Sequence, residues 1–265
     1  MPASSLRLME AATAMAVAAV ALVPVARAEP GARTGAPVAW RAIEPGAAYA
    51  FVEDDVRLEL LRFDLRRFRA SVVVAGSGPS ERQTASQVLR RSGAVVAAVN
   101  GGFFDGRGRP LGLRVDRGDT LVPFRRRVDW GVFYVSDRRA HIVHSRDYAV
   151  APGTEAAIQV GPRILIDGVV PKLKPQIARR TAVALTEHGD TITLVVAPEP
   201  VAADSLGARL AALGYHVALM LDGGPSTQLA ARLGGRVGSG ERREAELLEI
   251  PGAYAVPDLL TIVRR

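Results

Sequence analysis

The chain has 265 residues, of which 48% are hydrophobic and 23% are charged, a balance typical of globular proteins with room for one large or two small domains. It contains no cysteine, which excludes a disulfide framework, a thiolate nucleophile and cysteine-ligated zinc. The formal charge is +7 and nearly all of the basic residues are arginine, a bias that genomic base composition explains most simply and that an affinity for anions would also explain. The arginines are scattered and aromatic residues make up only 5%, so we expect no nucleic-acid binding.

The N-terminal segment has the pattern of a secretory signal peptide. Arg7 precedes the apolar stretch 11–23, and Ala26-Arg27-Ala28 fits a small-x-small cleavage site. We therefore expect a signal peptide over residues 1–28, a tether over 29–44 and one domain over 45–265. The protein is then exported to the periplasm or secreted, and it is not an integral membrane protein after cleavage. An uncleaved anchor is the alternative.

The next elements are strands and a helix. The stretch 57–74 predicts two strands with a bend near Arg66 and Arg67. Thr84 is a good N-cap for a helix that Gly93 ends, and a wholly apolar strand over 94–99 then runs into Asn100-Gly101-Gly102.

The same order recurs later in the chain. Asp204 caps a helix over 205–213, Gly214 stops it, and an apolar strand over 215–221 ends in Asp222-Gly223-Gly224. This pattern indicates an internal repeat in which two strands of one sheet deliver Asn100 and Asp222 to the same edge. A chance similarity of two helix-strand units is the alternative.

Between and after the two units the pattern is that of β-structure. We expect hairpins over 111–122, 130–143 and 180–198, a strand within 156–170, an irregular loop over 171–179 and a C-terminal strand. The predicted fold class is α+β: a single compact domain on a mixed, mostly antiparallel sheet with a few helices.

A polar residue followed by two glycines at the end of a buried strand suggests a site. The strand fixes the direction of the polar side chain, and the glycines let a ligand or another backbone approach closely. The alternative is a tight turn with a capping Asn or Asp. Phe103, Phe104 and Asp105 beside the first motif favour a site.

Several motifs together resemble the phosphodiester glycosidase family. They are "NGGFF", "PLGLRVDRGD", "AIQVGPRILIDG", "RTAVAL" and "LMLDGGPST", in that order. The resemblance covers about residues 45–263 and implies hydrolysis of the sugar–phosphate bond in sugar-1-phosphodiesters, with bacterial relatives tied to envelope sugars or exopolysaccharide. Pro225 stands where many members have a third glycine, which puts an anion cradle of backbone N–H groups in doubt.

The resemblance and the residue chemistry together nominate the site. Asp222 is the expected nucleophile or general base, Asp105 the second carboxylate, and Asn100 and Gln159 are expected to bind sugar hydroxyls or an N-acetyl group. Arg180, with Arg163, is expected to clamp the phosphate. The remaining predicted substrate-binding residues are Gly101, Gly102, Gly223, Gly224, Ser226 and Thr227.

The residue pattern leaves the cofactor and the class of activity partly open. His141 and His144 should face opposite sides of a strand, which argues against joint metal ligation, and no cofactor is required. A carboxylate-bound Ca²⁺ or Mg²⁺ remains an option, because oxygen ligands carry no fixed motif. A non-catalytic protein that binds anionic glycan is the alternative function, and a purely structural envelope protein is a third.

Overall fold

The computed structural model describes residues 38–54, 56–75, 78–149, 153–234 and 246–265. The expected signal peptide and most of the expected tether lie outside these residues. The expected tether is too long at its C-terminal end, because residues 41–44 form strand β1 (Arg41–Glu44). By its contacts the chain divides into residues 1–32 and a compact unit over 33–265, which contains all the described elements.

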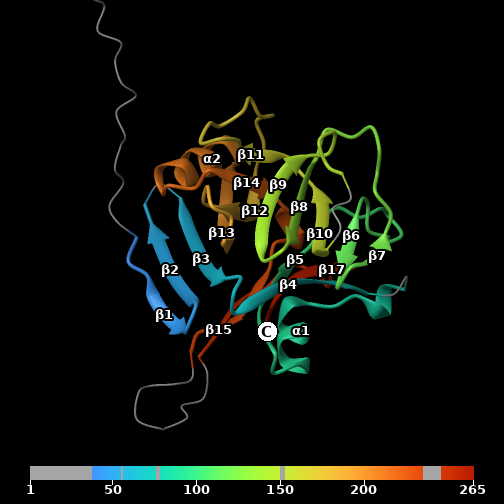
Figure 1. The fold of residues 1–265 in the computed structure, drawn as a ribbon, viewed down its shortest axis with the longest axis horizontal. Coiled ribbons are helices and arrows are strands. Elements are labelled where there is room, and N and C mark those ends of the chain that lie inside the picture. Colours follow the sequence, from blue (N-terminus) through green and yellow to red (C-terminus); the bar gives the residue numbers. More distant parts are fainter. Residues whose placement is uncertain (1–37, 55, 76–77, 150–152, 235–245) are drawn as a thin grey trace, which may run out of the picture. The chain divides into compact units, whose positions relative to one another are not determined.

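Three antiparallel sheets build the described unit (Figure 1). The seven-stranded sheet has the order β1 (Arg41–Glu44), β2 (Ala47–Glu53), β3 (Arg57–Asp64), β13 (Thr191–Ala202), β12 (Ile177–Leu185), β14 (Val217–Met220) and β11 (Arg163–Leu165). A five-stranded sheet follows the order β16 (Leu247–Ile250), β15 (Leu229–Arg232), β5 (Val95–Asn100), β17 (Asp258–Arg264) and β4 (Phe68–Val74). The other has β7 (Asp119–Val122), β6 (Arg114–Asp116), β10 (Thr154–Val160), β8 (Gly131–Ser136) and β9 (Arg139–His144).

Two α-helices cover outer faces of these sheets. Helix α1 (Ala85–Arg91) packs on β5 and β15, and α2 (Ala203–Ala212) packs on β11, β12 and β13. Two short 3-10 turns, η1 (Pro79–Glu81) and η2 (Gly224–Ser226), complete the described elements. The α+β class is confirmed, and every ladder between described strands is antiparallel, so the sheets are more uniform than the expected mixed sheet.

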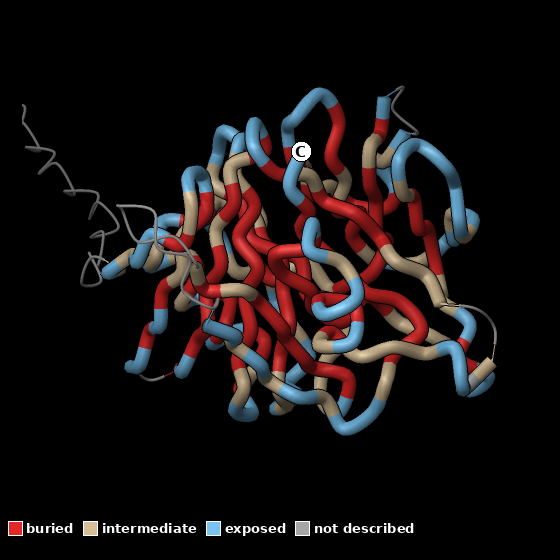
Figure 2. The backbone as a smooth tube through the Cα atoms, turned by 90° about the horizontal axis from the view of Figure 1, so that it is seen from below, coloured by how far each residue is buried: buried red, intermediate tan, exposed pale blue. Residues whose placement is uncertain are grey.

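Period-two alternation explains why so many strands are wholly apolar. In β12 the side chains of Val183 and Leu185 enter the core shared by the three sheets, whereas Ala182 and Ala184 face α2 on the other side. Both faces of this stretch are buried, and the polar residues that precede it on β12, Arg180 and Thr181, are buried with hydrogen-bond partners inside the protein. Figure 2 shows the consequence: buried residues fill the middle of the unit, and exposed residues are concentrated in the loops.

The two predicted helix-strand units are present, with corrected details. Thr84 caps α1 as expected, but the helix ends at an extended Ser92, and Gly93 does not have a positive φ. Asp204 is not the N-cap of α2, because β13 runs directly into the helix at Ala202; its carboxylate instead accepts the Ser205 N–H in the first turn. The two strands belong to different sheets, not to one.

The expected strand over 156–170 is two strands in two sheets. Strand β10 ends at Val160 and β11 begins at Arg163, with a cis Gly161–Pro162 peptide between them. Proline has no N–H to donate to a ladder, so the pairing breaks there and the chain passes to the other sheet.

A buried ion pair ties two of the sheets together. Arg114 on β6 pairs with Asp258 on β17, and the two side chains are 0% and 1% exposed. The Arg114 guanidinium also donates to backbone carbonyls, including those of Leu113 at 3.0 Å and Gln159 at 3.1 Å. Its positive charge is therefore enclosed on all sides by acceptors.

We predict that D258N lowers the free energy of unfolding by about 3–5 kcal/mol, because it leaves the Arg114 guanidinium buried without a counter-charge. Urea unfolding measures the loss. The matched control is R41A, which removes an ion pair with Glu246 whose partners are 50% and 62% exposed, and it should cost less than about 1 kcal/mol. Equal, small losses for both variants would contradict this prediction.

Candidate active site

The two polar-Gly-Gly motifs meet, although they come from different sheets. The Asn100 amide donates from Nδ2 to the Asp222 carbonyl at 2.7 Å, and the Asp222 N–H donates to the Gly101 carbonyl at 3.0 Å. The end of β5 is thereby fastened to the segment that follows β14. The sequence predicted this meeting, but by way of a shared sheet.

The other side of the Asn100 amide is also occupied. Its Oδ1 accepts the Thr181 hydroxyl at 2.7 Å and the Gln228 N–H at 3.2 Å, and the residue is 0% exposed. Asn100 therefore has no surface for a sugar, contrary to the expectation of direct contact. It lies beneath the site and positions Asp222.

The Asp222 carboxylate is held by its own turn. Oδ1 accepts the Gly223 N–H at 2.9 Å, and Oδ2 accepts the Ser226 hydroxyl at 2.7 Å. Burial raises the pKa of the Asp222 carboxyl above its ordinary value of 3.8, against the opposing effects of these two hydrogen bonds and of the Arg114 charge. Such a carboxyl can hold a proton at a higher pH than an exposed aspartate does.

The glycines of the first motif make room for protein, not for substrate. A Cβ on Gly101 would lie 2.3 Å from Asp258 Oδ1, and a Cβ on Gly102 would lie 2.5 Å from Arg114 Nη2. Both glycines are buried, so the predicted contact of Gly101 and Gly102 with substrate is not what the structure shows. Their lack of a side chain instead lets the buried ion pair pack against the backbone.

The two glycines of the second motif differ: Gly224 lies in open surroundings, whereas Gly223 is closely packed. Gly224 has a φ of +59°, and a Cβ there would meet nothing within 4 Å. A Cβ on Gly223 would lie 2.9 Å from the Arg179 carbonyl and 3.7 Å from Arg180 Nη1. Gly223 thus lets the turn that carries Asp222 pass close to Arg180.

Arg180 is a buried cation without a carboxylate partner in the described part of the chain. It is 3% exposed, and its guanidinium donates to the carbonyls of Val201, at 3.2 Å, and Gln176. Burial lowers the pKa of this guanidinium below its ordinary value of 12.5, and no ion pair among the described residues opposes that effect. An anion entering beside Arg180 would restore the missing counter-charge.

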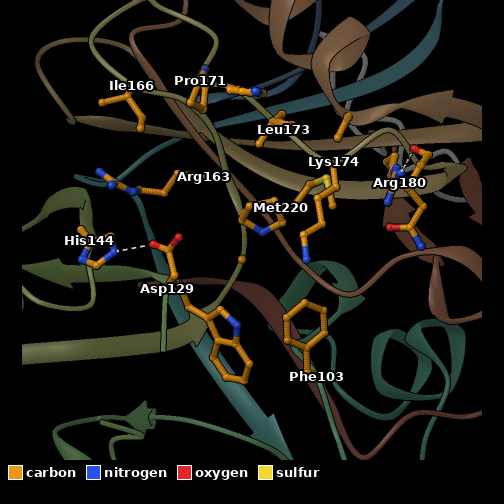
Figure 3. Close-up of a pocket in the computed structure, with 16 residues that line it drawn as sticks. Phe103, Asp129, His144, Arg163, Ile166, Pro171, Leu173, Lys174, Arg180 and Met220 are labelled. Atoms are coloured by element: carbon orange, nitrogen blue, oxygen red, sulfur yellow. Dashed lines mark hydrogen bonds and ion pairs between the residues drawn. The ribbon is translucent and has the colours of Figure 1, made fainter. Parts of the chain in front are cut away.

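Arg180 borders a cavity of about 510 Å³, which we call the substrate cavity (Figure 3). Phe103, Trp130, Leu173 and Met220 give it apolar walls. Its charged lining consists of four cationic residues, Arg163, Lys172, Lys174 and Arg180, and a single carboxylate, Asp129. Lys172 and Lys174 are the only lysines in the chain. The excess of positive charge suits an anionic ligand.

Asp129 and His144 are cavity residues that the sequence analysis missed. His144 Nε2 lies 2.7 Å from Asp129 Oδ1, as Figure 3 shows, and His144 Nδ1 accepts the Arg146 N–H at 2.9 Å. Because Nδ1 accepts, the ring proton is on Nε2 and points to Asp129. This hydrogen bond lowers the pKa of Asp129, which therefore stays ionised. No motif marks either residue; only their meeting in space does.

The other predicted residues lie apart from the cavity. The side chain of Gln159 is 0% exposed and binds the backbone of Leu113 and Arg125 and the hydroxyl of Ser145. Asp105 caps its own loop through Arg107 and Arg109, and the Arg109 hydrogen bonds lower its pKa. Gln159 is thus enclosed by the protein, whereas Asp105 is partly exposed and engaged by its own loop, and neither lines the substrate cavity.

The two predicted hydroxyl residues are buried as well. Ser226 is 1% exposed and its hydroxyl lies between Asp222 and Tyr254, 3.2 Å from the Tyr254 hydroxyl. Thr227 is 0% exposed, and its hydroxyl has no hydrogen-bond partner within the described residues. These positions support Asp222 from behind and do not line the substrate cavity.

The described residues offer no evident metal site and no transmembrane helix. No group of three or more histidine or acidic side chains is clustered in that part of the chain, so a cation would have to be held by fewer such ligands. None of its helices has the length and apolar character needed to cross a membrane.

The sequence is similar to those of known proteins. The model of a family described as phosphodiester glycosidase matches residues 93–261. The curated protein YigE of Escherichia coli K12, described as uncharacterized, is 29% identical over 119 residues, which is 40% of this chain and 47% of YigE. The match thus spans about half the length of that relative.

Solved structures share the fold. The catalytic domain of zebrafish N-acetylglucosamine-1-phosphodiester alpha-N-acetylglucosaminidase, auto-inhibited by its pro-peptide, has a TM-score of 0.61 at 17% identity, over 86% of this chain and 87% of that one. A hypothetical protein from Synechocystis has a TM-score of 0.55 at 16% identity, covering 87% and 64% of the two chains. For a putative exported protein of Burkholderia pseudomallei the values are 0.53 and 14%, with coverage of 82% and 74%.

We predict that N100A lowers the free energy of unfolding by about 2–5 kcal/mol, because the Asp222 carbonyl, the Thr181 hydroxyl and the Gln228 N–H all lose a buried partner. Chemical denaturation measures this. T181V removes only one of these hydrogen bonds and should cost about 1 kcal/mol. An N100A variant as stable as T181V would mean that the two motifs are not joined through this amide.

A second prediction concerns the pH dependence of stability. The folded-state pKa of Asp222 is raised above 3.8, so its contribution to stability is greatest below that pH and is lost as the pH rises through the folded pKa. Relative to D222N, the wild type should therefore become less stable as the pH rises from about 4 through the folded-state pKa of Asp222. Thermal unfolding of both proteins across this range tests the sign, and a difference that is constant or grows with pH would contradict it.

Proposed function

Because the chain belongs to the phosphodiester glycosidase family, we propose that it hydrolyses the bond between sugar and phosphate in sugar-1-phosphodiesters. The observation that carries this proposal is Arg180, a buried cation without a carboxylate partner in the described part of the chain, which borders the substrate cavity and lies next to Gly223. Such a guanidinium can bind a phosphate oxygen in place of the missing counter-ion. The turn beside it carries the carboxyl of Asp222.

The leaving group sets the chemical requirement. A phosphodiester on an anomeric carbon departs as a phosphate monoester, which is a weak base and needs charge stabilisation more than full protonation. Arg180, together with Arg163 in the same cavity, supplies that charge. Fixed cations that already point at the cavity act without reorganisation when negative charge develops.

Two carboxyl groups have opposite pKa shifts: Asp129 lines the substrate cavity, whereas Asp222 is not among its lining residues and lies on the turn beside Arg180. Burial raises the pKa of Asp222, and the His144 hydrogen bond lowers that of Asp129. Opposed shifts of this kind separate a proton-holding group from an ionised one. We assign the proton transfer at the sugar to Asp222, on the turn beside Arg180, whereas Asp129 lies with His144 at the other end of the cavity and borders the path of the leaving group.

The named neighbours suggest which sugar to test and where in the cell the protein acts. The zebrafish neighbour is named for N-acetylglucosamine-1-phosphodiesters, so this sugar is the first to test. The apolar segment 11–23 and the description of the Burkholderia neighbour as a putative exported protein support export. We propose that the protein acts on sugar phosphodiesters of the cell envelope or of exopolysaccharide.

A binding protein without catalysis is the second candidate. The excess of cationic residues in the substrate cavity would also hold an anionic glycan that is not cleaved. Asp222 distinguishes the two functions. In an enzyme, D222N abolishes turnover and keeps binding, whereas a binding protein shows no turnover even in the wild type.

We predict that the purified protein releases free sugar from an N-acetylglucosamine-1-phosphate diester or from a UDP-sugar, with or without added divalent cation. In water enriched in heavy oxygen the label should enter the sugar, because the C–O bond to the anomeric carbon is cleaved. Label in the phosphate would contradict the assigned roles. No release from a broad panel of sugar-1-phosphodiesters would overturn the enzymatic function.

We predict that R180A lowers kcat/KM for the best diester of that panel by about 10²–10³-fold, because a preorganised cation facing the developing charge is lost. R180K should recover only part of the activity, since an ammonium group cannot reproduce the planar fork. Arg91 is exposed on α1, so R91A serves as the matched control. Equal activities of R180A and R91A would rule out a phosphate clamp at Arg180.

A further inference from the structure

A second cavity adjoins the substrate cavity. Its volume is about 690 Å³, and the segments 124–129 and 144–148 line it. Asp129 and His144 line both cavities, so this hydrogen-bonded pair stands between them. Figure 3 shows the pair at one end of the substrate cavity and Arg180 at the other. A ligand that extends past Asp129 therefore reaches the second cavity.

The second cavity is also cationic. Arg126, Arg127 and Arg146 line it, and we call it the arginine cavity. All three side chains are exposed, and none forms an ion pair with a carboxylate in the described part of the chain. Its only acidic lining residue is Asp129, which already accepts the His144 ring proton.

The two cavities carry more positive charge than a substrate with a single phosphodiester would need. Together the two cavities present seven cationic side chains, namely Arg126, Arg127, Arg146, Arg163, Lys172, Lys174 and Arg180, against one carboxylate. A single phosphodiester carries one negative charge, which Arg180 and Arg163 can neutralise. The arginines beyond Asp129 would then have no anionic group of the ligand to bind. A leaving group with additional negative charge supplies one.

We propose that the arginine cavity binds a further phosphate of the leaving group. The substrate class is then a glycosyl phosphodiester whose leaving group is itself a chain of repeating phosphodiesters. This inference rests on the proposed function. It concerns the leaving-group side of the bond to be cleaved. No sequence motif indicates a binding site for that part of the substrate.

The aromatic residues of this cavity favour a repeating chain over a nucleotide. Phe124 and Tyr148 stack on each other with ring centroids 5.8 Å apart, and Tyr148 also packs edge-on against Tyr134 at 5.3 Å. These rings are used within the protein, as part of the apolar cluster on the outer face of β8 and β10. The exposed groups left for a ligand are the guanidinium groups, which bind phosphate oxygens in a bidentate way.

Titration calorimetry with defined probes tests the inference. The probes are sn-glycerol 3-phosphate, a synthetic trimer of glycerol phosphate, and uridine diphosphate, each at one fixed ionic strength because screening weakens exposed charges. The full-length protein is compared with R126A/R146A. The control R91A/R107A removes the same charge from two exposed arginines outside both cavities.

The expected result is a selective loss. The wild type should bind the trimer about tenfold more tightly than the monomer, and R126A/R146A should lose about tenfold in affinity for the trimer and less than about twofold for the monomer. The control should keep the wild-type ratio. Equal losses for both probes, or no advantage of the trimer in the wild type, would overturn the proposal.

Two further outcomes distinguish a nucleotide from a repeating chain, and the second phosphate site from the proposed hydrolysis. A selective loss for uridine diphosphate with none for the trimer would overturn the repeating chain in favour of a nucleotide. Sugar release from the monomeric diesters is scored separately. Intact release without a trimer advantage overturns the second phosphate site alone, whereas a panel with no release overturns the proposed function.

Discussion

The side-chain amide of Asn100 is the interaction on which the site depends. Its nitrogen reaches the segment after β14 and its oxygen reaches β12, so one residue at the end of β5 holds two elements of another sheet. Inside a protein such hydrogen bonds are strong, and losing them is costly, because no water can replace the partners. Asp222 and Arg180 lie on the two elements that Asn100 holds. Their relative position is therefore set from below, by a residue that never meets the solvent.

The glycines follow from the same constraint. Asp258 pairs with Arg114 directly against the backbone of Gly101 and Gly102, where any Cβ would collide with one of the two charged groups. A larger residue would have to separate the ion pair or push β5 away from β17. The Asn-Gly-Gly motif thus combines a connector between sheets with a space for a buried charge pair. Residues 100–102 resemble a ligand-binding loop in the sequence, but in the structure the two glycines serve mainly to pack the buried ion pair.

The sequence predicted local elements well and their assembly poorly. The strand at 95–100, the helix after Thr84 and the hairpins carry their own periodicity and turn residues, so they could be recognised without tertiary information. Sheet membership has no such local signal: β5 and β14 look alike in sequence but lie in different sheets. The burial of Gln159 has no local signal for the same reason, because its partners at Leu113, Arg125 and Ser145 come from three separate segments. Asp129 and His144 were missed since only folding brings the loop before β8 to the end of β9.

The family motifs and the lining of the substrate cavity therefore consist largely of different residues. Asn100, Gln159 and Ser226 belong to the motifs and are buried within the protein's own hydrogen-bond network. The charged lining of the cavity comes mostly from residues outside the motifs, such as Asp129, Lys172 and Lys174. A fold can keep its framework while loops change the groups that meet the ligand. The motif segments thus hold Asp222 and Arg180 in place, whereas the loops 124–129 and 171–176 supply most of the other charged groups of the two cavities. We therefore expect specificity for the leaving group to depend on these loops.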